Sequence, residues 1–154
     1  MTMSVPPGDR GVSTMQFTET ADQIEERAMQ ICRKWPKAYM FIITVRTIEL
    51  ASAIYEHAES ANSIFPITSE EERTERLLEL HRALAANINF SRKIERAFHM
   101  FPLCGDNQKL SDEMKEAKSS AILEELMTLC ATEEEALKGN ITFTRNYKIQ
   151  QRPR

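Results

Sequence analysis

The chain has 154 residues, a formal net charge of −3 at pH 7 and only four glycines. This length allows one domain with a substantial core and leaves little room for a second. So few glycines disfavour a fold built on tight turns or glycine-rich nucleotide-binding loops, and the charge excludes a uniformly basic nucleic-acid binder. Helix-favouring residues are abundant and β-branched residues never alternate for long, so we expect an all-α protein.

The cysteines and the absence of apolar runs bear on location. Cys32, Cys104 and Cys130 form no close pair and show no metal-ligand spacing, which is typical of thiols in a reducing compartment. No apolar run reaches the length of a membrane span, and the first residues lack the basic-then-apolar order of a signal peptide. We therefore expect a cytoplasmic protein without membrane contact.

The N-terminal part divides into a leader and a first helix. Residues 1–15, MTMSVPPGDRGVSTM, contain two of the six prolines and two of the four glycines, which predicts a flexible leader. A first helix follows, with Thr18 or Thr20 as its N-cap. Trp35-Pro36 ends it, because the residue before a proline resists the α region.

A second helix is expected from about Lys37 to Ile64. Its apolar residues occupy nearly the whole circumference at roughly 100° per residue, so one side remains apolar after the core is covered. That surplus side predicts a subunit interface. The alternative is a central helix whose aromatic residues only border the surface. The candidate interface residues are Tyr39, Phe41, Ile48 and Tyr55.

A third helix is expected from the Thr68-Ser69 cap to about Phe101. Three glutamates directly after the cap favour this start. Asn87 and Ser91 fall within the apolar side, which predicts a small polar layer in the core. Hydrogen bonds that fix the helix register explain such a layer better than a catalytic role does.

A fourth helix is expected from Ser111 to about Lys138, where Gly139-Asn140 is a stop signal. Residues 141–154 then alternate apolar and polar residues before turning basic. This pattern predicts a basic C-terminal tail that becomes ordered on a partner. Its basic residues are Arg145, Lys148, Arg152 and Arg154.

Four helices with short links predict an antiparallel up-down-up-down four-helix bundle over residues 16–140. The sequence contains no nucleophile elbow, P-loop, dinucleotide motif or HExxH, and its three histidines lack the Glu-x-x-His spacing of bundle metal sites. We therefore expect no enzymatic activity, no cofactor, no metal and no small-molecule substrate. An active site in the core would need convergent polar groups, of which the sequence offers few.

Basic residues gather on one side of the expected third helix, opposite its apolar side. They span about three turns within roughly 120° of the helix circumference. One interpretation is an ordinary solvated face; the other is a surface that contacts the phosphates of a nucleic acid together with the basic tail. The residues of this basic stripe are Arg82, Arg92, Lys93, Arg96 and His99.

The segment Trp35–Met40, WPKAYM, with the following Phe41 and Arg46, resembles the start of the second helix in a family of bacterial and phage four-helix-bundle proteins. This family includes the accessory variability determinants of diversity-generating retroelements and the proteins encoded by 23S ribosomal RNA intervening sequences. An aromatic-Pro-Lys-x-Tyr-x-Phe stretch followed by an arginine carries the resemblance. A further likeness lies in the third helix, from Leu77 to Ile94.

The resemblance implies a homopentameric barrel that has no catalytic activity. It further implies binding to a reverse transcriptase and to its RNA template, or the derived DNA, during mutagenic retrohoming. An oligomeric protein-interaction scaffold that binds no nucleic acid is the alternative, which the net negative charge favours.

Overall fold

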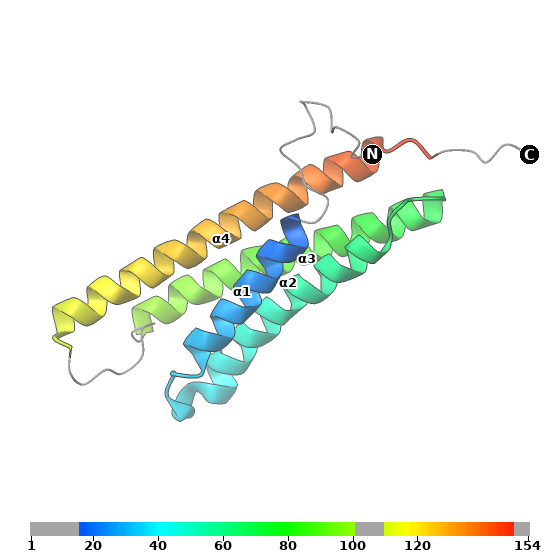
Figure 1. Ribbon diagram of the computed structural model, residues 1–154. Coiled ribbons are helices and arrows are strands. Elements are labelled where there is room, and N and C mark those ends of the chain that lie inside the picture. Colours follow the sequence, from blue (N-terminus) through cyan, green and yellow to red (C-terminus); the bar gives the residue numbers. More distant parts are fainter. Residues whose placement is uncertain (1–15, 101–109, 150–154) are drawn as a thin grey trace, which may run out of the picture.

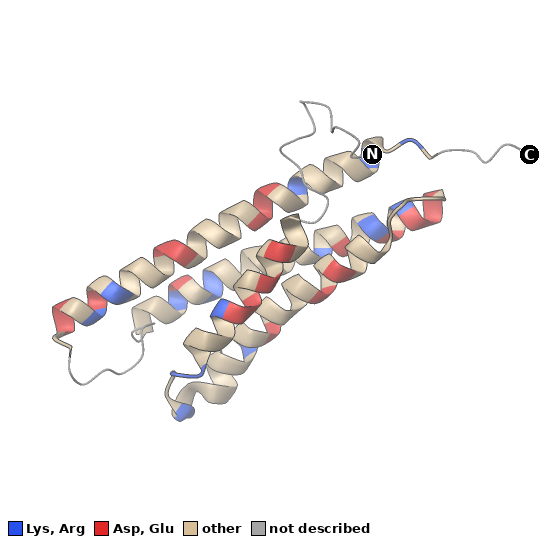
Figure 2. Ribbon diagram, in the orientation of Figure 1, with Lys and Arg blue, Asp and Glu red and all other residues tan. Residues whose placement is uncertain are grey.

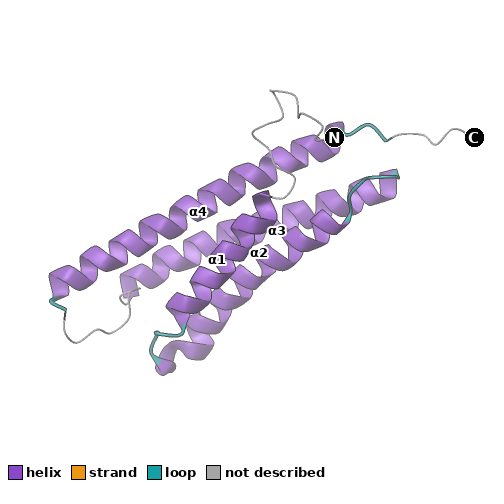
Figure 3. Cartoon of the chain, in the orientation of Figure 1, coloured by secondary structure: helices purple, strands orange, loops and turns teal. Residues whose placement is uncertain are grey.

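The computed structural model describes residues 16–100 and 110–149 (Figures 1 and 3). Within these ranges the chain forms four α-helices and no strand. The expected leader, Cys104, Arg152 and Arg154 lie outside the described residues. The helices are α1 (Gln16–Cys32), α2 (Val45–Ser63), α3 (Glu70–Met100) and α4 (Asp112–Asn146).

The four helices form a bundle in which each helix packs against two neighbours: α1 against α2 and α4, and α3 against α2 and α4 (Figure 1). Successive helices run in opposite directions. Contacts between α3 and α4 show this order, because Arg76 meets Thr144 while Asn87 meets Cys130. The predicted all-α four-helix architecture is therefore confirmed.

The core follows the alternating three- and four-residue spacing of packed helices. On α3, Leu80, Ala83, Phe90 and Ile94 are buried along one such row. Each of the other helices contributes a similar row. These rows include Phe17, Ile24 and Ala28 of α1, Ala51, Ile54 and Ala58 of α2, and Leu126, Cys130 and Leu137 of α4.

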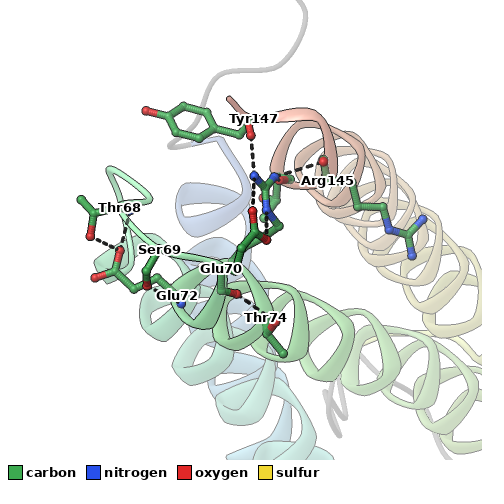
Figure 4. Close-up of polar contacts among 9 residues, drawn as sticks. Thr68, Ser69, Glu70, Glu72, Thr74, Arg145 and Tyr147 are labelled. Carbon is green, nitrogen blue, oxygen red and sulfur yellow. Dashed lines mark hydrogen bonds and ion pairs between the residues drawn. The ribbon is translucent and has the colours of Figure 1, made fainter. Parts of the chain in front are cut away.

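The helix caps agree with the sequence at α3 and α4. The Ser69 hydroxyl accepts from the amide of Glu72, and the Glu72 carboxylate accepts from the amide and hydroxyl of Thr68 (Figure 4). Ser111 accepts from the amide of Met114 in the same way. The expected cap of α1 is wrong, because the helix already begins at Gln16.

The second helix is continuous from Lys37 but starts irregularly. A 3₁₀ turn at Lys37–Tyr39 and a π-helical turn at Met40–Thr44 lead into α2. The segment Lys37–Ser63 includes an 18-residue window of hydropathy 1.3, long and apolar enough to cross a membrane, of which 22 % is buried. The expectation that no segment reaches this length is therefore wrong. A core helix passes the same test, so no membrane role follows.

The fourth helix is longer than the sequence predicts. Gly139-Asn140 does not stop it, and α4 continues to Asn146. Asn140 stays inside because its amide donates to the carbonyl of Ala136 and its oxygen accepts from Arg76. The predicted boundary at residue 140 is therefore wrong, since residues 141–146 are part of the bundle and not of a tail.

Candidate nucleic-acid interface

The basic stripe predicted on α3 lies on its outward side. Arg92, Arg96 and His99 are exposed and Lys93 is partly buried, while the buried row of α3 lies on the opposite side. Arg92, Lys93 and Arg96 make no ion pair with any residue in the described ranges. These three side chains are therefore available to an anionic partner.

Arg82 differs from the other stripe residues because the fold already uses its charge. Its guanidinium donates to Glu79 at 2.9 Å, and the other oxygen of the same carboxylate lies 2.6 Å from Nδ1 of His57 on α2. Burial opposes ionisation of Glu79, but the hydrogen bonds from His57 and Arg82 outweigh it and lower the Glu79 pKa. Arg82 thus belongs to a contact between α2 and α3.

The basic residues near the C-terminus do not join the stripe. Arg73 fixes this end of α4: its guanidinium donates to the backbone carbonyls of Thr144, Arg145 and Tyr147 and pairs with Glu70 (Figure 4). Lys148 lines a surface hollow that also includes Glu70. Nineteen residues of helix separate Arg73 from Arg92, about 28 Å at 1.5 Å per residue.

The nine predicted contact residues therefore do not form one surface. Arg92, Lys93, Arg96 and His99 lie together in the second half of α3, where Figure 2 shows basic segments. Arg145 and Lys148 lie at the opposite end of the bundle, beside the acidic start of α3. Periodicity within one helix identified the stripe, but the length of α4 placed its end far from it.

A second basic surface, which sequence reasoning missed, lies between α1 and α4. Four bases and one acid line a cleft of about 550 Å³ there. Arg27, Arg33 and Lys34 come from the end of α1, where they match the helix dipole and so attracted no further attention. Lys118 comes from the second turn of α4, and only the tertiary fold brings it to them.

The candidate interface residues have different positions. Phe41 is 86 % exposed and Tyr39 lies beside it in the same irregular start, whereas Ile48 and Tyr55 are half-buried against the core. The surplus apolar surface is thus concentrated at Tyr39–Ile42 and does not follow the whole helix. We call residues 39–42 the apolar turn.

Buried polar side chains form no catalytic arrangement that we can identify among the described residues. The guanidinium of Arg76 is fully buried and donates to Thr144 Oγ1, to Asn140 Oδ1 and to the carbonyl of Ala61. It also lies over the Phe17 and Phe65 rings. Burial lowers its pKa. These contacts tie α2, α3 and α4 together, which explains Arg76 structurally.

Asn87 and Glu133 are the remaining buried polar side chains of interest. Asn87 donates to the carbonyl of Cys130 at 2.9 Å, so the polar position predicted for the core is present. Glu133 is fully buried, and neither of its carboxylate oxygens has a hydrogen-bond partner among the described residues. Burial raises its pKa to about 8. No group of three or more potential metal ligands occurs in the described ranges.

Comparisons with known proteins found no matching family model, curated protein or solved structure. The resemblance around Trp35–Arg46 therefore stays a prediction from the sequence. What the chain does must be argued from its surfaces.

Proposed function

We propose that this chain is a non-catalytic accessory protein of a diversity-generating retroelement in the cytoplasm. In this role it binds a reverse transcriptase and its template nucleic acid. The observation that carries the proposal is the unpaired basic row of Arg92, Lys93 and Arg96 on the outward side of α3. Basic side chains that the fold does not use are the groups that contact phosphates and release counterions.

The nucleic-acid part of the proposal is tested with Arg92→Glu combined with Arg96→Glu. A labelled RNA of template sequence should be retained by the wild-type protein in a filter assay, with retention falling as salt rises. The double variant should lose this retention and keep its helical circular dichroism spectrum. Lys138→Glu is the control for charge alone, because Lys138 is an exposed α4 lysine paired with Glu134. Equal retention by the double variant would contradict the proposal.

The protein-interaction scaffold is the second candidate, because the chain has a net charge of −3 and α3 begins with Glu70, Glu71 and Glu72. An acidic surface of this kind suits a basic protein partner. Co-purification with the reverse transcriptase before and after nuclease treatment separates the two candidates. Recovery of the polymerase without any RNA, with no binding in the filter assay, would favour the scaffold.

We further propose that the accessory protein is a homo-oligomer, a pentamer by the resemblance, with the apolar turn at its subunit interface. Phe41 and Ile42 are the most exposed large apolar side chains of the described residues, and they lie in the segment that carries the family resemblance. Large apolar side chains grouped at the surface mark interaction sites. In sedimentation experiments the wild type should be oligomeric at micromolar concentration, and Phe41→Asp with Ile42→Asp should be monomeric. A monomeric wild type would refute this part.

A further inference from the structure

The cleft between α1 and α4 is built from one row of side chains on each helix. Both rows have the i, i+3, i+4, i+7 spacing of a single helical face. Arg33 lines the cleft beside them. The α1 row is Arg27, Gln30, Ile31 and Lys34, and the α4 row is Lys118, Ala121, Ile122 and Glu125.

The register of the two helices gives the cleft two different ends. At one end the guanidinium of Arg27 meets Glu125 at 3.2 Å. Because the helices run in opposite directions (Figure 1), seven residues along each of them leads to Lys34 and Lys118 at the same level, about 10 Å from the ion pair. One end is therefore closed by an ion pair, and the other has a lysine on each side.

The basic end of this cleft has no acidic counterpart among its lining residues. The one lining carboxylate, Glu125, already accepts from Arg27, while Arg33, Lys34 and Lys118 make no ion pair within the described ranges. Positive charges held around a hollow with low-dielectric walls concentrate the potential there and attract anions. The α1 bases complement their helix dipole, but Lys118 is near the positive end of α4 and gains nothing from it.

The lining also has an apolar component that a simple ion site does not need. Ile31, Ala121 and Ile122 line the cleft together with the bases. The volume of about 550 Å³ lies within the range of roughly 300–1,000 Å³ typical of sites for small organic ligands. A ligand with both anionic and apolar parts, of the size of one nucleotide, matches these features.

We propose that the α1–α4 cleft binds the phosphodiester backbone of a single polynucleotide strand. Lys34, Lys118 and Arg33 contact phosphate oxygens, and the apolar side chains accommodate the sugar or base of one nucleotide. The inference rests on the proposed nucleic-acid function and adds a second contact surface to the α3 stripe. Lysine and arginine are the side chains that bind phosphate oxygens most strongly.

The test is fluorescence anisotropy with a labelled 20-nucleotide single strand, titrated at several salt concentrations. Lys34→Ala combined with Lys118→Ala should weaken binding by about tenfold or more and reduce the salt slope by about two, one for each lost phosphate contact. Lys118→Glu and Lys138→Glu are a matched pair, since both change the charge of one exposed α4 lysine equally. Only the first should weaken binding. Competition with free mononucleotide and inorganic phosphate separates a strand site from a free-phosphate site.

The outcomes separate this inference from the proposed function. Unchanged affinity in the Lys34/Lys118 variant, with loss of binding in the Arg92/Arg96 variant, would overturn the cleft and leave the function intact. Displacement of the strand by free mononucleotide at equal concentration would also overturn it, since the cleft would then be a small-anion site. Absence of any binding by the wild type would refute both proposals together.

Discussion

Replacing Glu133 by glutamine should make the protein more stable at neutral and higher pH. Glu133 lies in the buried row of α4 between Cys130 and Leu137 and is fully inaccessible to solvent. Neither carboxylate oxygen has a hydrogen-bond partner among the described residues, and burial raises its pKa to about 8. The nearby Cys130 thiol has a pKa raised to about 12, by burial and then by the Glu133 charge.

The magnitude and sign follow from proton linkage. The folded chain holds a proton on Glu133 up to about pH 8, whereas the unfolded chain releases it at about 4.5. Between these values the folded state binds more protons, so the free energy of unfolding falls as the pH rises. At about 1.4 kcal/mol per pKa unit, the ionised carboxylate costs on the order of 5 kcal/mol above pH 8. That is a large part of the 5–15 kcal/mol typical of a domain.

The assay is urea unfolding followed by circular dichroism at 222 nm between pH 4.5 and 8.5. Wild type and Glu133→Gln should have similar stability near pH 4.5, and the variant should be more stable by several kcal/mol at pH 8. Glu135→Gln is the control, because it removes an exposed carboxylate two residues away and should keep the wild-type profile. A constant difference between wild type and Glu133→Gln over the whole range would refute the buried-acid reasoning.

Three further predictions concern the contacts that hold the bundle together. Arg73→Ala should release the three carbonyls that end α4, costing about 1.5–3 kcal/mol and speeding hydrogen exchange at residues 144–147. Arg76→Met should cost about 3 kcal/mol in urea unfolding, because it leaves buried acceptors without their donor. Because burial raises the pKa of Cys32 and Cys130 to about 12, neither should react with a thiol reagent at pH 8 until urea unfolds the protein, in a variant lacking the third cysteine.

The sequence was sufficient for the four helices because apolar spacing and local caps determine them. It was insufficient for the end of α4. Gly139-Asn140 is a stop signal only where solvent competes for the backbone, and here Arg76 on another helix accepts the Asn140 side chain into the core. A distant residue overrode a local preference, and no local pattern contains that information.

The buried polar residues were partly readable. Arg76 and Asn87 fall in the same three- and four-residue spacing as Leu80, Ala83 and Phe90, and Glu133 falls between Cys130 and Leu137. A strict reading of that spacing predicts burial whatever the residue type. Charged residues are almost never fully buried without a partner, so the usual expectation placed them on the surface. The cleft was not readable, because it depends on which α1 and α4 residues lie opposite each other.

The printed polar contacts are unevenly distributed, and this bears on where a ligand binds. At one end of the bundle, Arg73 and Arg76 join α3 to the end of α4 through six hydrogen bonds or ion pairs with buried or backbone partners. Between α1 and α4 the side-chain contact is the Arg27–Glu125 pair, and beyond it the cleft widens toward three unpaired bases. Adding a strand there costs the fold no existing contact and relieves the repulsion between like charges. The basic end is therefore the place where binding stabilises the bundle most, and a saturating single strand should raise its melting temperature through Lys34 and Lys118.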